Sequence, residues 1–294
     1  MKTLLFIYNP HSGKAKMAAR LHEITEVFQN EGYLVTTYAT TGPQDATRAA
    51  RELAGDYDHV VCAGGDGTLN EVVSGLMDGG YQGALGYLPA GSTNDFSRTL
   101  HLPTDPVEAA KVAVTGQPVL CDVGRFNHSR FVYVAAFGLF TAVSYETPQE
   151  FKNLFGHTAY VLAGIRSLTD VTPYRLRLRW DGGELEDTFI YGAVSNSTRV
   201  GGFRGMLSDQ VVLDDGLFEV MLVKKPTSLP QLNAIIAALL KGQPNDNVIA
   251  FQTGEMEIQS ADEIPWTLDG ENGGRHCLVH IGAYPGAVRL MTQQ

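Results

Sequence analysis

The sequence predicts two domains: an α/β N-terminal domain of the doubly wound kind, and a mostly β, sandwich-like C-terminal domain. Over the first 125 residues, short apolar and β-branched runs alternate with longer stretches of helical periodicity, as in a parallel sheet covered by helices. Beyond about residue 126, several segments alternate apolar and polar residues, as strands with one buried face do. We therefore expect an α/β domain over 1–125 and a β-rich domain over 126–294. The last few residues of the chain could pack back against the N-terminal domain.

The elements of the first domain alternate in a regular order. Strands are predicted at 3–8, 34–39, 59–63, 84–88 and 119–123, and helices at 15–29, 45–54, 69–77 and 106–114. In the first helix Leu21, Ile24 and Phe28 recur on one face, and Gly32 follows as a stop signal. The polar, Gly-rich segments of this half follow strands. We expect them to meet at the carboxyl edge of the sheet, where open α/β sheets bind ligands.

The second half contains short strands and two predicted helices. Its clearest strand is Tyr174–Trp180, and others are predicted at 131–136, 188–194, 217–223, 255–258 and 277–281, with turns at 181–183 and 215–216. Helices are predicted at 158–168 and 229–241. The second helix is apolar but far shorter than the ~20 residues that a membrane span requires. No transmembrane segment is expected.

Composition argues against several classes of protein. The formal net charge is −10, and Lys and Arg are not clustered as a nucleic-acid binder needs. The three cysteines match neither a disulfide framework nor a zinc motif, and the first apolar run is too short for a signal segment. A cytoplasmic protein without a nucleic-acid partner is expected. The arginines concentrated in the second half leave two alternatives open, a local basic patch or a solvated strand face. They are Arg166, Arg175, Arg177, Arg179, Arg199 and Arg204.

The most informative segment is Gly64-Gly65-Asp66-Gly67-Thr68-Leu69-Asn70-Glu71, which follows a buried strand and opens a helix. Glycines let the backbone approach a phosphate closely, and a helix N-terminus favours negative charge. Thr68 can donate to a phosphate oxygen, and Asp66 can hold Mg²⁺ through water. The structural alternative is a tight βα turn capped by Asp66 or Thr68.

Two further loops have the same placement after a strand. One is Pro89-Ala90-Gly91-Ser92-Thr93-Asn94-Asp95, and the other is Asn9-Pro10-His11-Ser12-Gly13-Lys14. In the latter, Lys14 could meet a phosphate while Ser12 and Gly13 offer N–H groups, although Asn-Pro is also a common turn. None of the loops has the spacing of a P-loop or of a G-x-G-x-x-G motif. A nucleotide must therefore bind in another way.

Three aspartates are candidates for a magnesium network. Asp66, Asp95 and Asp122 each stand at a strand end or in the loop that follows. Mg²⁺ is commonly held by one or two carboxylates together with water and substrate phosphates. Two plainer roles remain open, because Asp95 can cap a helix and Asp122 can close a turn.

The three loops together resemble the diacylglycerol kinase catalytic domain of the lipid kinase family, and the chain looks like its small soluble bacterial members. This fold is shared with sphingosine kinases and, more distantly, with NAD kinases and phosphofructokinases. Further matches are Gly201-Gly202-Phe203, Leu213-Asp214-Asp215-Gly216 and Leu268-Asp269-Gly270-Glu271. The resemblance runs nearly end to end. It implies ATP- and Mg²⁺-dependent phosphorylation of a lipid hydroxyl, with diacylglycerol as the expected acceptor and phosphatidic acid as product.

The resemblance also implies roles for individual residues. Glu271 matches the general base of the family, helped by Asp269. Asp215 resembles the side-chain ligand of a structural metal site that the carbonyls of Val212 and Leu217 complete, for which a two-residue hairpin turn is the alternative. ATP would be held by loop residues together with Thr40, which is similar in position to a nucleotide contact of the family. The set is Asn9, Ser12, Gly13, Lys14, Thr40, Gly64, Gly65, Asp66, Gly67, Thr68, Asn70, Glu71, Gly91, Ser92, Thr93 and Asn94.

Several alternatives stay open at this stage. This chain has Ser208-Asp209-Gln210 where many relatives carry Pro-x-Ala, which leaves the geometry of the lipid site undefined. Other acceptors are a sphingoid base, undecaprenol or, as in NAD kinases, a soluble nucleotide, and a catalytically silent regulator is a further alternative. The expected partner is a lipid substrate at the inner membrane surface, with peripheral association. A homodimer is also left open.

Overall fold

The computed structural model describes residues 1–12, 16–91, 94–139, 172–197, 199–200, 203–204, 212–241 and 245–293. The predicted helix 158–168 and four predicted site residues, Gly13, Lys14, Ser92 and Thr93, lie outside these ranges. The chain divides into two compact units. Unit 1 comprises Met1–Val123 and Pro285–Gln294, and unit 2 comprises Gly124–Tyr284. Each unit has a hydrophobic core of its own.

Unit 1 is built on a parallel sheet with the strand order β2-β1-β3-β4-β15. Its strands are β1 (Lys2–Tyr8), β2 (Tyr33–Ala39), β3 (His59–Gly64), β4 (Ala84–Pro89) and the last part of β15 (Glu271–Thr292). The last of these joins the sheet through Arg289 opposite Ala84. β1 and β3 are almost continuous apolar runs, as expected for parallel strands with both faces covered. The α/β fold predicted for this half is therefore confirmed.

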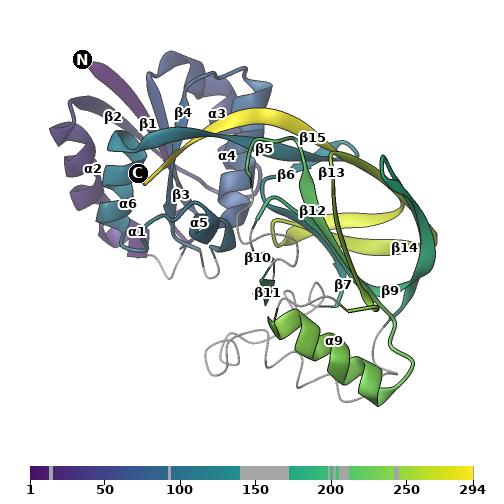
Figure 1. Cartoon of the computed structure of the whole chain (residues 1–294). Helices are drawn as coiled ribbons and strands as arrows, with labels where there is room; N and C mark the ends of the chain where they lie inside the picture. Colours follow the sequence, from purple (N-terminus) through teal and green to yellow (C-terminus); the bar gives the residue numbers. More distant parts are fainter. Residues whose placement is uncertain are drawn as a thin grey trace. The chain divides into compact units, whose positions relative to one another are not determined.

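Helices cover both faces of this sheet (Figure 1). They are α1 (Lys16–Ala19), α2 (Leu21–Asn30), α3 (Asp45–Leu53), the 3₁₀ turn η2 (Ala54–Asp56), α4 (Asp66–Asp78), α5 (Asp95–Thr99) and α6 (Pro106–Thr115). In the core, Leu4 and Phe6 of β1 pack with Ile24 and Phe28 of α2 and with alanines of α6. The prediction of one continuous helix over 15–29 was wrong. Two helices form instead, because Arg20, with φ −107° and ψ 9°, leaves the helical conformation.

The described part of unit 2 is an antiparallel β structure with one helix. Its strands are the end of β5 (Gln117–Phe126), β6 (Ser129–Phe131), β7 (Val134–Gly138), β8 (Tyr174–Trp180), β9 (Gly183–Ser195), β10 (Arg199–Val200), β11 (Phe203–Arg204), β12 (Phe218–Lys224), β13 (Val248–Thr253), β14 (Glu255–Leu268) and the first part of β15, and the helix is α9 (Leu229–Lys241). The order is β13-β12-β9-β7-β14-β15, and β8 pairs with both β9 and β14. The β-rich second half is confirmed. Of the helices that the structure describes, none has the length and apolar character to span a membrane.

The core of unit 2 is rich in aromatic rings. Trp266 of β14 packs against Phe126 and Phe137, with ring centroids 5.0 and 4.9 Å apart. Phe131 packs against Phe218 in the same core, at 5.2 Å. Burying such large rings contributes about 2–3 kcal/mol each to folding. The rings also hold β7 and β14 together next to the turn that carries Asp269.

Candidate active site

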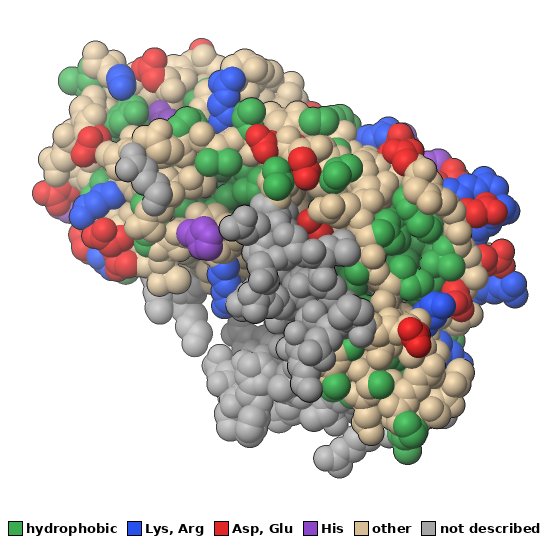
Figure 2. Space-filling model, in the orientation of Figure 1, with side chains coloured by type: hydrophobic (Ala, Val, Ile, Leu, Met, Phe, Trp, Pro, Cys, Tyr) green, Lys and Arg blue, Asp and Glu red, His purple; other side chains and the backbone are tan. Residues whose placement is uncertain are grey.

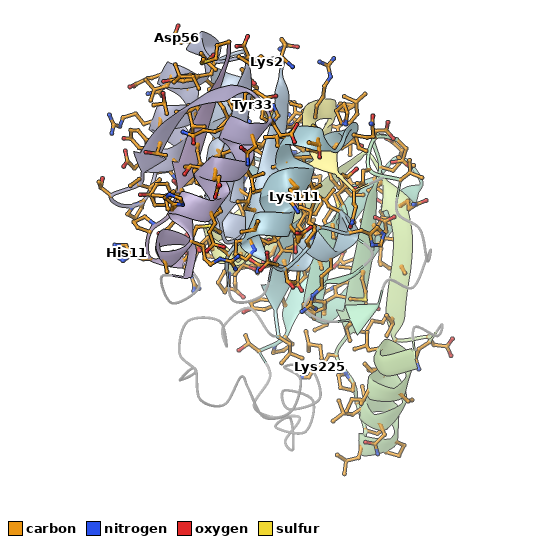
Figure 3. All side chains as sticks on the ribbon, turned by 90° about the vertical axis from the view of Figure 1, so that its left-hand side faces the viewer. Lys2, His11, Tyr33, Asp56, Lys111 and Lys225 are labelled. Atoms are coloured by element: carbon orange, nitrogen blue, oxygen red, sulfur yellow. The ribbon has the colours of Figure 1, made fainter. Side chains whose placement is uncertain are left out.

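The loops predicted to bind phosphate follow neighbouring strands of unit 1, at the carboxyl edge of the sheet. Figure 3 shows Lys2 and Tyr33, at the amino ends of β1 and β2, at one end of unit 1 and His11, in the loop after β1, at the other. Backbone hydrogen bonds tie the strand ends together. Asn9 N–H donates to Ala63 at 2.9 Å, and Thr40 N–H donates to Tyr8 at 2.9 Å. The expected meeting of the loops at one edge is thus observed.

The two Gly-rich loops touch each other through their glycines. Ala90 N–H donates to the carbonyl of Gly64 at 2.8 Å. A Cβ atom built on Gly91 would lie 2.6 Å from Cα of Gly65, and one built on Gly64 would lie 2.4 Å from the side chain of Thr68. A larger residue at Gly91 would have to push the two loops apart, and one at Gly64 would displace Thr68 of its own loop. The glycines thus allow the loops to pack closely, while their predicted approach to a phosphate stays a prediction.

Asp66 and Asp95 meet where α4 and α5 begin. Both are buried, and the Asp66 Oδ2 atom accepts the backbone N–H of Asp95 at 3.3 Å. Arg98 Nη1 lies 3.8 Å from Asp95 Oδ1. The contact joins the Asp66 carboxylate to the Asp95 backbone, so it brings two buried acidic residues together where two helices begin. This donor set fits a divalent cation that keeps several waters.

Asp122 lies on β5 and is fully buried. Its Oδ1 atom accepts the backbone N–H of Gly286 at 2.6 Å, so the carboxylate helps hold β15 beside β5. Among the residues that the structure describes, no group of three or more His, Cys, Asp or Glu side chains is arranged to hold a metal ion. Membership of Asp122 in a magnesium network stays a prediction.

Several predicted nucleotide contacts have partners within the protein. Asn94, with φ 49°, accepts Gly91 N–H at Oδ1 (2.7 Å) and donates from Nδ2 to the Gly91 carbonyl (2.9 Å). Asn9 Oδ1 accepts His11 N–H at 2.9 Å, and Asn70 Oδ1 accepts the Ser74 hydroxyl at 3.4 Å. These side chains shape the loops. Whether they also contact a nucleotide stays a prediction.

In unit 2, Asp269 and Glu271 flank a tight turn between β14 and β15. Leu268 pairs with Glu271, and Asp269 and Gly270 both have positive φ, 51° and 85°, as in the two-residue turns that join antiparallel strands. Glu271 is exposed at the first position of β15. The turn therefore presents this carboxylate to solvent at the end of the hairpin.

Asp269 is bound by the backbone of the segment before β7. Its Oδ2 atom accepts Val132 N–H at 2.7 Å, and its Oδ1 atom accepts the N–H groups of Tyr133 and Val134, both at 2.9 Å. The side chain is 3% exposed. Both carboxylate oxygens are therefore engaged by backbone donors, which fix the side chain in one orientation. The geometry favours a positioning role for Asp269 over the predicted role as a second base.

The predicted structural metal site at Asp215 is a turn in this structure. Leu217 N–H donates to Asp215 Oδ1 at 2.9 Å, and Gly216 has φ 75°. Val212 is 52% exposed. The contact of Asp215 with Leu217 does not test metal binding, so the metal site stays a prediction.

The arginines of β8 lie on a charged strand face that also carries acidic residues. Arg175 pairs with Glu186 at 2.8 Å, and Arg177 pairs with Glu184 at 3.2 Å. Figure 2 shows blue and red side chains intermingled over the β9 and β14 side of unit 2. The sequence allowed two interpretations of these arginines, a basic patch or a solvated strand face. Their ion pairs with glutamates favour the solvated strand face.

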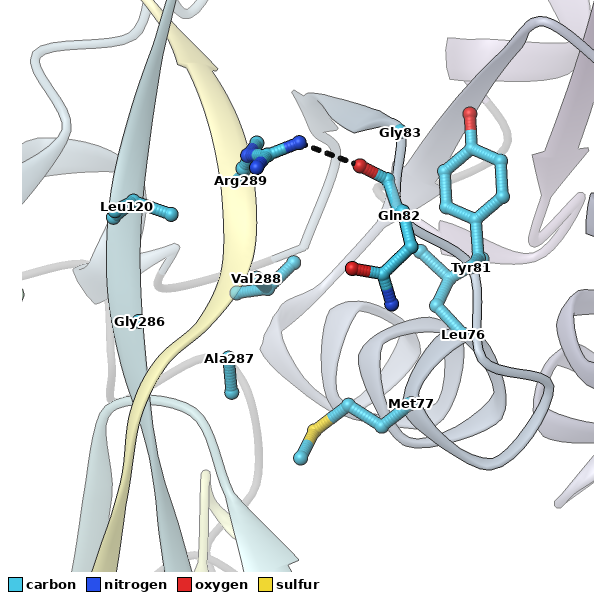
Figure 4. Close-up of a pocket in the computed structure, with 10 residues that line it drawn as sticks. All are labelled: Leu76, Met77, Tyr81, Gln82, Gly83, Leu120, Gly286, Ala287, Val288 and Arg289. Carbon is cyan, nitrogen blue, oxygen red and sulfur yellow. Dashed lines mark hydrogen bonds between the residues drawn. The ribbon is translucent and has the colours of Figure 1, made fainter.

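A small pocket of about 60 Å³ lies elsewhere in unit 1 (Figure 4). It is lined by Leu76 and Met77 from the last turn of α4, by Tyr81, and by residues of β15, where Arg289 Nη1 donates to the Gln82 carbonyl at 2.8 Å. Ten residues of helix separate Leu76 from Asp66, which corresponds to ~15 Å. The pocket is therefore not the predicted phosphate site.

The fold and the loops define a class of protein, a two-domain kinase with glycine-rich loops in place of a P-loop. A model of the diacylglycerol kinase catalytic domain matches residues 3–126, and a model of the YegS C-terminal NAD kinase beta sandwich-like domain matches residues 134–292. The chain belongs to the diacylglycerol kinase family. It is a phosphotransferase that uses an alcohol group as acceptor.

Individual relatives agree with this assignment. The chain is 35% identical to a diacylglycerol kinase of Staphylococcus carnosus, over 93% of this chain and 90% of the relative. It is 34% identical to a diacylglycerol kinase of Bacillus subtilis, over 93% and 91%. A crystal structure from Bacillus anthracis strain Sterne, named for the same kinase, aligns with a TM-score of 0.84 at 26% identity, covering 99% of this chain and 95% of that one. These relatives match both halves of the chain.

Proposed function

We propose that this protein transfers the γ-phosphate of ATP to the free hydroxyl of diacylglycerol, which gives phosphatidic acid and ADP. The observation that supports this most strongly is the meeting of Asp66 and Asp95 beside the touching Gly-rich loops, in a chain of this family. Phosphoryl transfer needs phosphate positioning, charge neutralisation and a group that accepts the hydroxyl proton. Each requirement has candidate residues in this chain.

In this proposal, unit 1 holds the nucleotide. The N–H groups at the start of α4, together with Thr68, bind phosphate oxygens, which the helix N-terminus favours. Asp66 and Asp95 would hold Mg²⁺, which would supply charge neutralisation at the phosphates when bound. The family implies the use of ATP, and the requirement for Mg²⁺ is part of the proposal.

In unit 2, Glu271 takes the proton from the lipid hydroxyl. The hydroxyl oxygen then forms a bond to the γ-phosphorus, the bond from that phosphorus to the bridging oxygen breaks, and ADP leaves with the electron pair. Asp269 does not accept the proton. It holds the turn so that Glu271 keeps one position, because positioned groups are more effective in transfer reactions. The protein binds its lipid substrate at the inner membrane surface.

The test is transfer of labelled γ-phosphate from ATP with Mg²⁺, comparing the native protein with Glu271→Gln. Diacylglycerol, sphingosine, undecaprenol and NAD are offered separately. We expect label on diacylglycerol, and a rate lower by about 10²–10⁴-fold in the variant. Glu263→Gln is the matched control, because Glu263 is an exposed residue of β14 that pairs across the hairpin with Arg275.

Other outcomes would overturn parts of the proposal. Label on sphingosine or undecaprenol alone would change the acceptor, and label on NAD alone would contradict the lipid substrate. A Glu271→Gln variant as fast as the control would remove Glu271 from its role as base. A protein that binds ATP but labels no acceptor would be a regulator.

A further inference from the structure

Glu71 was predicted to contact the nucleotide, but its carboxylate is bound to another helix. Its Oε1 atom accepts the backbone N–H of Gln44 at 2.9 Å, and its Oε2 atom accepts that of Ala46 at 3.2 Å. Glu71 lies in the second turn of α4, whose first residue is Asp66. The residue therefore links the helix of the Gly-rich loop to the N-terminal end of α3.

Asp45 makes a second link in the same region. Its Oδ2 atom accepts the Thr41 N–H at 2.8 Å and the Thr41 hydroxyl at 2.9 Å, and its Oδ1 atom accepts the Tyr38 hydroxyl at 2.9 Å. Arg48 Nη2 also donates to Oδ1, at 2.6 Å. The Thr41 N–H first, and then Arg48, hold the pKa of the Asp45 carboxyl well below its usual range. Asp45 thus stays charged and keeps the loop after β2 closed on α3.

The loop between these two carboxylates has a restrained backbone. Gln44 has φ 64°, a conformation that residues other than glycine rarely adopt unless their surroundings hold them there. Glu71 accepts the N–H of Gln44, and Asp45 follows it directly. Thr40, which opens the loop, is buried and donates its N–H to Tyr8. The segment from Thr40 to Ala46 is therefore attached to β1, α3 and α4.

The two helices beneath this loop are packed closely enough to move together. A Cβ atom on Gly75 of α4 would lie 2.3 Å from the carbonyl oxygen of Thr47 in α3, and one on Gly79 would lie 2.7 Å from that of Arg51. Backbone contact of this kind leaves little freedom for sliding. A displacement of α3 would therefore reach the loop that Glu71 holds.

We propose that Glu71 and Asp45 are positioning residues that hold the Thr40 loop in a fixed place beside the Gly-rich loop, so that both are arranged for ATP before it binds. The proposal rests on the proposed function, in which this edge of unit 1 binds ATP. A loop that is ordered in advance loses less conformational entropy on binding, which appears as affinity. The two residues then determine ATP affinity and leave the transfer step to others.

The experiment measures ATP binding by calorimetry in Glu71→Gln, Asp45→Asn and the control Glu26→Gln. Glu26 is an exposed residue of α2, a helix that carries neither test residue. Each test variant keeps the size of the side chain and loses a charged acceptor of backbone N–H groups. We expect the Kd for ATP to rise about tenfold in both test variants and to stay within about twofold in the control.

Kinetics separate positioning from a general loss of structure. The KM for ATP should rise with Kd, while kcat at saturating ATP and the KM for the lipid stay within about twofold. The Asp45→Asn/Glu71→Gln double variant should lose less than the product of the two single losses, because both residues hold one loop. Amide exchange at Gln44 and Ala46 should be faster in Glu71→Gln than in the control.

Each contrary result has a distinct meaning. An unchanged Kd in folded test variants would overturn the proposal, and so would a lost kcat with an unchanged Kd, which would place Glu71 in the chemistry. Failure of the native protein to bind ATP would instead overturn the proposed function. If a test variant does not fold, Tyr38→Phe removes only one donor to Asp45. A Kd about threefold higher would then support the proposal, and an unchanged Kd would contradict it.

Discussion

The two units use buried aspartates in different ways. In unit 1, Asp66 lies next to a second buried carboxylate, Asp95, and accepts its backbone N–H at 3.3 Å. In unit 2, Asp269 is more deeply buried and accepts three backbone N–H groups at 2.7–2.9 Å. The first arrangement brings two buried acidic residues together, and such a donor set fits a hydrated divalent cation. The second stabilises the fold around the charge, so the partners of a buried aspartate, and not its burial, indicate its role.

The largest effect expected is on the rate of the Asp66→Asn variant. The variant should transfer phosphate about 100-fold more slowly or worse. It loses one of the two residues proposed to hold Mg²⁺, and with the ion goes the charge neutralisation at the phosphates. Thermal stability should be kept, because asparagine has the same size and its side-chain oxygen can still accept the Asp95 N–H. Initial rates across Mg²⁺ concentrations and melting curves check this. The control is Asp56→Asn, because Asp56 is exposed at the opposite end of unit 1 (Figure 3). If Asp66→Asn kept its rate but lost thermal stability, the two units would have exchanged roles in the comparison.

Asp269→Asn should show the opposite pattern, with a loss of stability. Asparagine accepts positive φ readily, so the turn chemistry is kept while one charged acceptor of the three N–H groups is lost. We expect the free energy of unfolding to fall by about 2 kcal/mol, the cost of leaving a buried donor without its charged partner. Denaturant titration measures this. Asp262→Asn, exposed on β14, should change stability by less than about 0.5 kcal/mol.

The contrast between a cation site in unit 1 and a purely structural aspartate in unit 2 would weaken if unit 2 also held a metal ion. Asp215 is exposed and accepts Leu217 N–H, so a metal at this turn would add modest stability. If the site exists, a chelator should lower the melting temperature by about 2–4 °C in the native protein and leave Asp215→Ala unaffected. A variant that still responds to the chelator would exclude Asp215 as the ligand. No response in the native protein would leave the turn as its role.

The smallest effect concerns acid sensitivity, which we expect in unit 1. Burial lowers the pKa of His59 from its usual 6.5, and its Nε2 atom lies 2.8 Å from the Ala113 carbonyl. The unfolded chain therefore binds a proton more readily, and stability falls as the pH drops through 6.5. Between pH 7 and 6 the loss should reach at most about 0.7 kcal/mol. Denaturant titrations of the native protein and His59→Gln at both pH values test this, and an equal loss in both would show that other groups are responsible.

The elements of unit 1 could be predicted closely because their signals are local. The first four strands were placed to within one residue at either end, since each is a short apolar run bounded by polar or glycine residues. Unit 2 was harder. β13 was not predicted, and β14 and β15 are far longer than the segments expected within them, because interior polar residues, Gly282 and Pro285 resemble strand ends and the register of β14 shifts near Gln259.

The site shows the same limit. Residue types and loop spacing identified the Gly-rich loops and Asp66, since these signals lie within about ten positions of each other. The partners of Glu71 and Asp269 could not be predicted, because Gln44 is 27 residues from Glu71 and Val132 is 137 residues from Asp269. For Glu71 this changed the interpretation from a nucleotide contact to a link between helices.

By itself, the sequence determined the order of elements, the kinase family and the chemical groups available at each loop, because periodicity, turn residues and short motifs are local properties of the chain. Only the tertiary structure decided which of those groups have partners within the protein. The physical reason is that a buried carboxylate is defined by the donors around it. In this protein the donors to Glu71 and Asp269 come from distant segments, so these two residues acquire their roles only once the chain has folded, whereas the donors to Asp45 lie within seven residues of it.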